Sequence, residues 1–289
     1  MQREKFINYL TSEKRFSDHT ITSYSNDIKQ FMLFLSDEYE INSSISDVNF
    51  QIVRSWIASL LENGLTPRSV NRKISTLKTY FKFLIREEII HESPMLKVIA
   101  PKSQKRLPTF VEEEQIESLL TEVEFDDGFL GERDKLIIEL FYVTGIRLSE
   151  LIDITISDIN FEDNLVKVLG KRNKERLIPL SQRIVEALKL FIEKYDISNY
   201  LFTNLKGTRV YTKLVYRVVN KYIGKISSIN KKSPHILRHT FATHMLNNGA
   251  DINAIKELLG HANLSATQVY THNTIEKLKS VYKQAHPRA

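Results

Sequence analysis

Apolar residues recur at helical spacing through the first hundred residues of this 289-residue chain. Over a helix predicted from Asp18 to Phe34 they return every three or four positions and form one stripe, Ile21, Tyr24, Ile28, Phe31 and Leu35. Another helix, the third of the chain, is expected after Asp47. The Asp47 carboxylate would cap this helix, and Gly64 would end it. The N-terminal part of the chain is therefore predicted to be all helical.

The helix predicted from Thr66 to about Glu88 has two contrasting faces. Thr66 is a favoured N-cap and Pro67 a favoured first helical residue. One face is apolar and consists of Val70, Ile74, Leu77, Phe81 and Leu84. The opposite face is basic and rich in hydroxyls and consists of Arg68, Arg72, Ser75, Thr79, Lys82 and Arg86. Such a face suits DNA phosphates or a major groove, although a solvated basic surface has the same pattern.

The helical pattern breaks at residues 98–108, which contain two prolines and a cluster of basic side chains. This segment is the predicted linker between two domains, 1–97 and 109–289. The second domain is mostly helical, with helices expected at 182–194 and 212–225. Its β insertion is a predicted hairpin with strands Leu165–Leu169 and Arg176–Leu180.

Composition adds a basic balance and several exclusions. The formal charge is +6, and between Thr66 and Arg106 ten Lys and Arg stand against three Glu, which favours an anionic partner. The absence of cysteine excludes disulfides, thiolate metal sites and a cysteine nucleophile. No apolar run is long enough to span a membrane, and the first residues do not form a signal peptide. A cytoplasmic protein is expected.

The most informative stretch runs from Ser233 to Tyr270. A helix beginning at Pro234 would carry His235 and Arg238 on one face near its positive end. His261 follows the glycine that ends the next predicted helix. Arginine and histidines at helix ends, with a tyrosine nearby, would suit an oxyanion such as a phosphodiester.

Residues 145–151, 235–241 and 258–261, followed by Tyr270, occur in the order and at the spacings of one family. The chain resembles the tyrosine site-specific recombinases (phage integrase family), most closely the Xer recombinases of bacterial chromosome-dimer resolution. The resemblance implies a mainly α fold. An N-terminal all-helical core-binding (SAM-like) domain would precede a mixed α/β catalytic domain with a small antiparallel β-sheet.

The resemblance also implies a catalytic set, which is Arg147, Lys171, His235, Arg238, His261 and Tyr270. Tyr270 would attack the scissile phosphate and form a 3′-phosphotyrosine, leaving a 5′-hydroxyl. Arg147 and Arg238 would hold the two non-bridging oxygens, because a guanidinium donates two fixed bonds and keeps its charge.

The remaining members would move protons and orient the arginines. His235 and His261 would hydrogen-bond to the phosphate, with His235 the better acceptor of the tyrosine proton. Lys171, in a turn that also contains Arg172 and Lys174, would protonate the leaving 5′-oxygen. Glu150 would not touch the phosphate itself and would orient an arginine that does.

Neither a metal nor another cofactor nor ATP is expected, since the phosphotyrosine conserves the bond energy. Zinc binding by His235 and His239 is the alternative, disfavoured by the lack of an H-E-x-x-H pattern and of cysteine. The predicted DNA contacts, to bases or to phosphates, are Arg68, Arg72, Lys82, Lys213 and Arg217.

The expected partners are double-stranded DNA at a recombination site, further copies or a paralogous recombinase in a tetramer, and a septal DNA translocase. Residues 273–284 form a terminal helix that would dock into a neighbouring protomer, or alternatively pack on its own domain. Rival functions are a mobile-element integrase, a type IB topoisomerase-like enzyme and a non-catalytic DNA-binding accessory protein.

Overall fold

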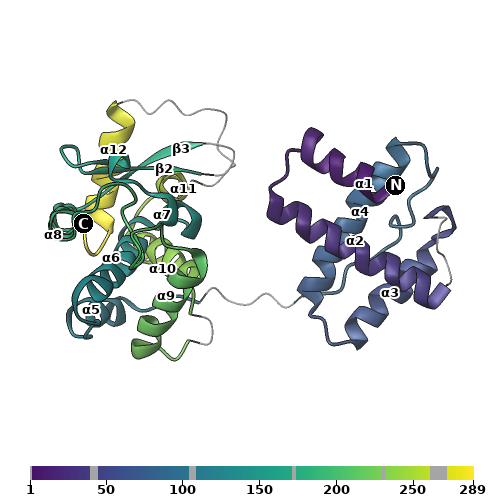
Figure 1. Cartoon of the computed structure of the whole chain (residues 1–289), viewed down its shortest axis with the longest axis horizontal. Helices are drawn as coiled ribbons and strands as arrows, with labels where there is room; N and C mark the ends of the chain where they lie inside the picture. The colour runs from purple at the N-terminus through teal and green to yellow at the C-terminus, as the bar shows by residue number, and fades with distance from the viewer. Residues whose placement is uncertain (1, 40–44, 104–108, 171–173, 230–231, 261–271) are drawn as a thin grey trace. The chain divides into compact units, whose positions relative to one another are not determined.

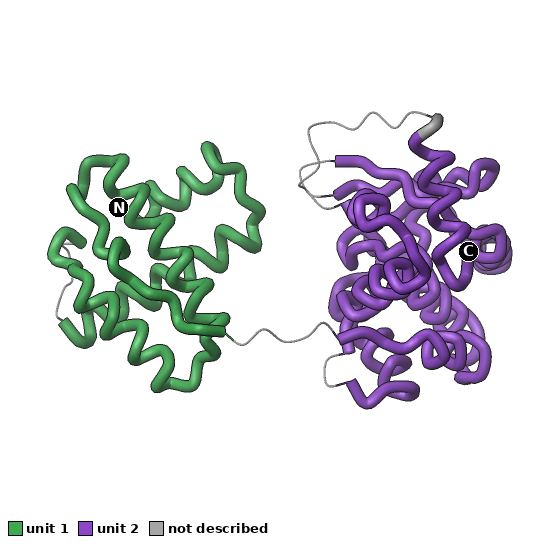
Figure 2. Tube along the Cα trace, turned by 180° about the vertical axis from the view of Figure 1, so that it is seen from behind, with its two compact units in different colours: residues 1–106 green, residues 107–289 purple. Residues whose placement is uncertain are grey.

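The computed structural model describes residues 2–39, 45–103, 109–170, 174–229, 232–260 and 272–289. They form two compact units, residues 1–106 and 107–289, each with a hydrophobic core of its own (Figures 1 and 2). None of the helices within these ranges is both long and apolar enough to cross a membrane.

Unit 1 is helical in all its regular elements that the structure describes. They are α1 (Gln2–Asn8), the π-helical turn η1 (Tyr9–Glu13), α2 (Asp18–Tyr39), the 3₁₀ turn η2 (Ile45–Asp47), α3 (Phe50–Glu62) and α4 (Pro67–Arg86). Helices α2, α3 and α4 meet at Phe31, whose ring packs edge-on against Trp56 and Phe81. The apolar face predicted for α4 is buried, which confirms it.

The two predicted helix starts in unit 1 differ in outcome. Thr66 caps α4, because its hydroxyl accepts from the backbone N–H of Ser69. The prediction that Asp47 caps α3 is wrong, since Asp47 ends the turn η2 and the cap is Asn49, whose Oδ1 accepts from the N–H of Ile52 at 3.1 Å. Ile45 and Val48, on either side of Asp47, are both buried, and the chain forms the 3₁₀ turn between them before the helix begins.

Unit 2 combines helices with a three-stranded antiparallel sheet in the order β1-β2-β3. Its elements are α5 (Glu113–Thr121), α6 (Gly128–Thr144), α7 (Leu148–Asp153), the 3₁₀ turn η3 (Ile156–Asp158), β1 (Ile159–Asn160), β2 (Leu165–Leu169), β3 (Glu175–Pro179), α8 (Gln182–Lys194), α9 (Thr212–Ile226), α10 (Pro234–Asn247), α11 (Ile252–Leu259) and α12 (His272–Ala285). The predicted fold class and hairpin are confirmed, with β3 starting one residue earlier than expected.

Helix α6 lies in the core of unit 2 and packs against α10. It ends at Gly145, which adopts φ +59°. A Cβ atom at this position would lie 2.5 Å from a ring carbon of Phe241 in α10 and 2.8 Å from a methyl of Leu259 in α11. Only glycine permits this approach, which brings the turn before α7 up to the ends of α10 and α11.

Helix α12 packs on β3, α10 and α11 of its own unit (Figure 1). It buries Leu278 and Tyr282 in the core of unit 2. Beyond it, the His286 ring stacks on Tyr282 at 5.1 Å, and the buried Arg288 pairs with Glu117 and Glu139. The described part of the terminal segment is thus tied to its own unit, and its docking into a neighbour stays a prediction.

Candidate active site

Three arginines from three segments converge on the C-terminal end of α11. The carbonyl oxygens of Leu258, Leu259 and Gly260 accept, in that order, from Arg176 Nε at 2.7 Å, Arg238 Nη2 at 2.6 Å and Arg147 Nη2 at 2.8 Å. The last carbonyls of a helix lack intrahelical partners and carry the negative end of its dipole. The end of α11 is therefore a natural acceptor for three guanidinium groups.

Arg147 and Arg238 reach this point from two different segments. Arg147 immediately precedes α7, and its backbone N–H and Nη1 donate to the two oxygens of Glu150 at 2.8 and 2.7 Å. Its side chain remains 32% exposed. Arg238, on the first turns of α10, is buried and donates through Nη1 to the carbonyl of Gly145 at 2.6 Å. The two guanidinium groups thus share one surface, and only that of Arg147 is substantially open.

Glu150 is the carboxylate at the centre of this cluster. Its side chain is 1% exposed, and Arg176 donates to both of its oxygens at 2.8 Å. Burial pushes the pKa of Glu150 upward, but the hydrogen bond and charge of Arg176, followed by the bonds from Arg147, outweigh burial and lower it to about 2. The carboxylate is ionised at neutral pH, so three guanidinium groups face a single negative charge. The surplus is positive and suits an anion.

The surplus charge also affects Arg238 and His235. Burial, and then repulsion from Arg147 and Arg176, lower the pKa of Arg238 to about 9, so it stays protonated at neutral pH. Partial burial, followed by the charges of His239 and Arg238, lowers the pKa of His235 below its ordinary 6.5. A neutral imidazole at this place is able to accept a proton. The arrangement provides anion contacts beside a candidate base.

The structure brings together Arg147, Glu150 and Arg238, with His235 one helical turn before Arg238. The predicted catalytic residues Lys171, His261 and Tyr270 lie outside the described residues, and their roles stay predictions. Two of them directly follow described glycines. Gly170 and Gly260 both border the cluster, since a Cβ at either would lie within 4 Å of Arg176.

The cluster contains one residue that the sequence reasoning missed, Arg176. It was assigned only to a predicted strand. Strand alternation carries the signal, because Arg176 is in phase with the buried Ile178 and therefore points into the unit. A buried arginine needs hydrogen-bond acceptors, so the same alternation also predicts a buried partner for Arg176.

A metal site finds no support in the described part of the chain. No group of three or more His, Asp and Glu side chains lies there in a position to hold an ion. The zinc alternative for His235 and His239 therefore gains nothing from the structure.

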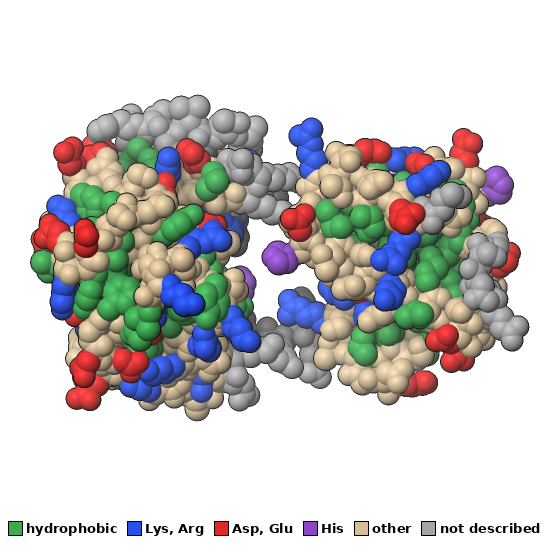
Figure 3. Space-filling view, in the orientation of Figure 1, with side chains coloured by type: hydrophobic (Ala, Val, Ile, Leu, Met, Phe, Trp, Pro, Cys, Tyr) green, Lys and Arg blue, Asp and Glu red, His purple; other side chains and the backbone are tan. Residues whose placement is uncertain are grey.

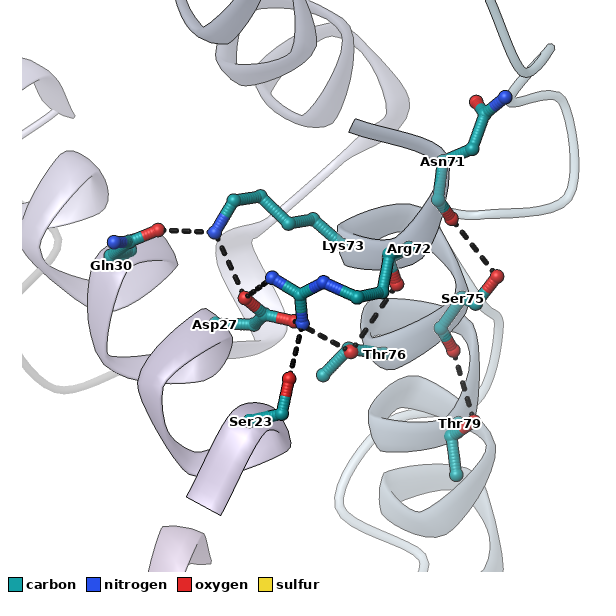
Figure 4. A network of polar contacts seen from close by, with 9 residues as sticks. All are labelled: Ser23, Asp27, Gln30, Asn71, Arg72, Lys73, Ser75, Thr76 and Thr79. Atoms are coloured by element: carbon teal, nitrogen blue, oxygen red, sulfur yellow. Dashed lines mark hydrogen bonds and ion pairs between the residues drawn. The ribbon is translucent and has the colours of Figure 1, made fainter. Parts of the chain in front are cut away.

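The basic face predicted on α4 is exposed at Arg68, Arg72 and Lys82. Arg72 is anchored, since its two Nη atoms pair with the two oxygens of Asp27 on α2 (Figure 4). Asp27 is 1% exposed and also accepts from Lys73 Nζ and Thr76 Oγ1, both at 2.9 Å. The charges of Asp27, Arg72 and Lys73 leave one positive charge in excess.

The second predicted basic surface lies on α9. Lys213 and Arg217 are exposed, and Arg217 Nη2 donates to the Tyr211 hydroxyl at 2.7 Å. Figure 3 shows Lys and Arg side chains gathered over the part of unit 2 where α9 lies. Both predicted surfaces are thus available for a ligand, while DNA contact by their residues stays a prediction.

Comparisons with known proteins point to one family. Residues 109–277 match the phage integrase family, and residues 4–88 match the phage integrase N-terminal SAM-like domain. Tyrosine recombinase XerC of Staphylococcus epidermidis is 41% identical over 99% of this chain and 97% of its own. Tyrosine recombinase XerC of Pelotomaculum thermopropionicum is 37% identical over 99% and 98%.

Solved structures share the fold. The Tn1549 transposon integrase in complex with circular intermediate DNA has a TM-score of 0.73 at 20% identity, covering 96% of this chain and 97% of that one. The XerH site-specific recombinase bound to its difH substrate has a TM-score of 0.71 at 22% identity, covering 97% and 84%.

Proposed function

The chain belongs to the phage integrase family and is a site-specific tyrosine recombinase of the Xer type, and on this premise we propose that it cuts and rejoins double-stranded DNA through Tyr270. The recombination resolves chromosome dimers at cell division. The observation that carries the chemistry is the cluster at the end of α11, where three guanidinium groups meet and two of them share the single carboxylate of Glu150.

The scissile phosphodiester brings one negative charge to this surplus. Its non-bridging oxygens are ionised and therefore accept stronger hydrogen bonds than the backbone carbonyls that Arg147 and Arg238 contact in the absence of DNA. The same two arginines stabilise the additional charge that builds up on these oxygens in the transition state. Each donor of this kind contributes roughly 2.7–4 kcal/mol.

Tyr270 supplies the nucleophile. Its oxygen forms a bond to phosphorus while the bond from phosphorus to the 5′-oxygen breaks, which leaves a 3′-phosphotyrosine and a 5′-hydroxyl. His235 takes the tyrosine proton, in keeping with its lowered pKa, and Lys171 gives a proton to the 5′-oxygen. His261 adds a hydrogen bond to the phosphate.

Religation runs the same steps in reverse with the 5′-hydroxyl of another strand. Because the phosphotyrosine keeps the energy of the broken ester, neither ATP nor a metal ion enters the reaction. Pairwise exchange of this kind passes through a Holliday junction.

The working assembly is a cytoplasmic tetramer on two recombination sites, formed with further copies or with a paralogous recombinase. A septal DNA translocase activates it. Residues 1–97 form the core DNA-binding domain, residues 98–108 the basic linker, and residues 109–289 the catalytic domain with its exchange helix. The exposed basic faces of α4 and α9 contact the duplex through Arg68, Arg72, Lys82, Lys213 and Arg217.

Covalent trapping tests this proposal. A duplex carrying the dimer-resolution site of the chromosome that encodes the chain is nicked so that the cleaved end diffuses away, and wild type is compared with Tyr270→Phe on a denaturing gel. We expect a protease-sensitive adduct from wild type that retains the 3′-phosphate side of the cut, and none from the variant. An adduct that persists in Tyr270→Phe would show that another residue is the nucleophile.

A further inference from the structure

We propose that Arg176 is a positioning residue for strand cleavage, which keeps the charge of Arg147 free for the phosphate and fixes the end of α11. The inference rests on the proposed function. It assigns a task to a side chain that is not expected to touch DNA, because Arg176 is buried on β3 with a side chain 4% exposed.

Arg176 donates hydrogen bonds to two residues on different helices. Nη1 and Nη2 donate to the two oxygens of Glu150, each at 2.8 Å, and Nε donates to the carbonyl of Leu258 at 2.7 Å. One planar group therefore ties the first turns of α7 to the last turn of α11. A lysine has a single nitrogen and cannot make this fork.

Two glycines also lie close to the guanidinium group of Arg176. A Cβ atom on Gly260, which has φ +64°, would lie 3.1 Å from Cδ and Nη1 of Arg176. A Cβ atom on Gly170 would lie 3.5 Å from Glu150 Oε1 and 3.7 Å from Arg176 Nη1. These glycines directly precede His261 and Lys171 in the sequence. The guanidinium of Arg176 thus lies at the chain positions from which both predicted catalytic segments start.

The charge balance explains why Arg147 depends on Arg176. Each oxygen of Glu150 accepts one bond from Arg176 and one from Arg147. With Arg176 present, the carboxylate has a buried counter-charge of its own, and Arg147 adds a charge that is not needed for neutrality. Without Arg176, Arg147 becomes the only arginine hydrogen-bonded to a buried carboxylate and is held back from the phosphate.

Arg133 offers a matched control elsewhere in unit 2. It is also a buried arginine, donating through Nε and Nη2 to Asp134 Oδ1 at 2.9 and 2.6 Å and through Nη1 to the carbonyl of Thr203 at 3.1 Å. Replacing either arginine by lysine removes a buried fork between a carboxylate and a carbonyl. Only Arg176 lies in the cluster around Glu150.

The first test compares Arg176→Lys with Arg133→Lys in the full chain, using the nicked duplex described above. Single-turnover adduct formation is measured at saturating protein, and DNA affinity is measured separately. We expect Arg176→Lys to slow adduct formation by about tenfold to a hundredfold, as when a residue that orients a metal ligand is replaced, with affinity unchanged within about twofold. Arg133→Lys should cleave at the wild-type rate.

The second test removes the unbalanced charge. Arg176→Met should slow adduct formation strongly, and adding Glu150→Gln should restore it several-fold, because a neutral amide no longer holds Arg147. Because Glu150→Gln also removes an unpaired buried charge and so restores stability, the rates are compared at a temperature at which circular dichroism shows every variant to be folded.

The outcomes separate the inference from the proposed function. No adduct from wild type in the presence of its paralogue would count against the function itself. A wild-type adduct with an unaffected Arg176→Lys, an equal loss in Arg133→Lys, or no recovery in the double variant would overturn the positioning role alone.

Discussion

The two units contain the same kind of polar cluster at different surfaces. In each, a carboxylate that is 1% exposed is paired with one buried cation and one half-open arginine. In unit 1 the carboxylate is Asp27, the buried cation Lys73 and the open arginine Arg72 (Figure 4). In unit 2 the corresponding groups are Glu150, Arg176 and Arg147.

The clusters differ in which cation donates two parallel hydrogen bonds to the two carboxylate oxygens. Arg72 uses both Nη atoms on Asp27, so the exposed arginine is the one that is immobilised. In unit 2 the buried Arg176 takes both oxygens, and Arg147 spends only one Nη on Glu150. We interpret the first arrangement as a fixed positive charge for a DNA backbone. We interpret the second as leaving Arg147 free to adjust its position while it contacts a reacting phosphate.

The largest effect should come from Glu150→Gln, which leaves Arg176 buried without its counter-charge. Breaking a buried pair costs about 3–5 kcal/mol, and the free energy of unfolding of unit 2 should fall by that amount. Urea unfolding followed by circular dichroism measures it. Fluorescence of Trp56, the single tryptophan of the chain and a residue of unit 1, provides the internal control. A loss below about 1 kcal/mol would contradict the assigned importance of the pair.

Acid should remove the same stabilisation from wild type. Its pKa near 2 against an ordinary 4.5 means that the folded protein binds the proton of Glu150 more weakly than the unfolded chain. The contribution, about 3 kcal/mol, is therefore complete above pH 4.5 and is lost as the pH falls towards 2. The stability difference between wild type and Glu150→Gln should shrink by about 2 kcal/mol between pH 6 and about pH 3. A difference that stays constant would show that this carboxylate does not cause it.

Asp27→Asn should have a smaller effect. Lys73 keeps a hydrogen bond to Gln30, and Arg72, whose side chain is 46% exposed, can turn to solvent. The expected loss is about 2 kcal/mol, the range for hydrogen bonds to charged groups. Trp56 fluorescence reports it directly, with the exposed Asp37→Asn on the same helix as the control. A loss equal to that of Glu150→Gln would remove the contrast between the two clusters.

The sequence predicted the parts of the fold that local chemistry determines. Thr66 and Pro67 mark the start of α4 because a hydroxyl cap and a fixed φ act within one turn. Gly64, which adopts φ +79°, lies just past the end of α3, because a positive φ at a helix end favours glycine. The prediction that Asp47 caps α3 is wrong because its neighbours Ile45 and Val48 are buried, and burial depends on the tertiary fold rather than on a local capping preference.

The candidate site was predictable in residue type and less so in its connections. The resemblance identified Arg147 and Arg238 as phosphate ligands and Glu150 as a residue that orients an arginine. Nothing local indicated that Arg176, on a strand distant in sequence, would share that carboxylate. The acceptors at the end of α11 are backbone atoms, which carry no sequence signature at all.

That last property affects how such sites change over generations. A point mutation can delete a side-chain acceptor, but it cannot delete the carbonyls of Leu258, Leu259 and Gly260 that the three arginines contact. Apolar substitutions at 258 and 259 would keep these anchors in place, so comparing aligned sequences would reveal no covarying partner for Arg238. The most durable contacts of the site are thus invisible to the usual search for coupled positions.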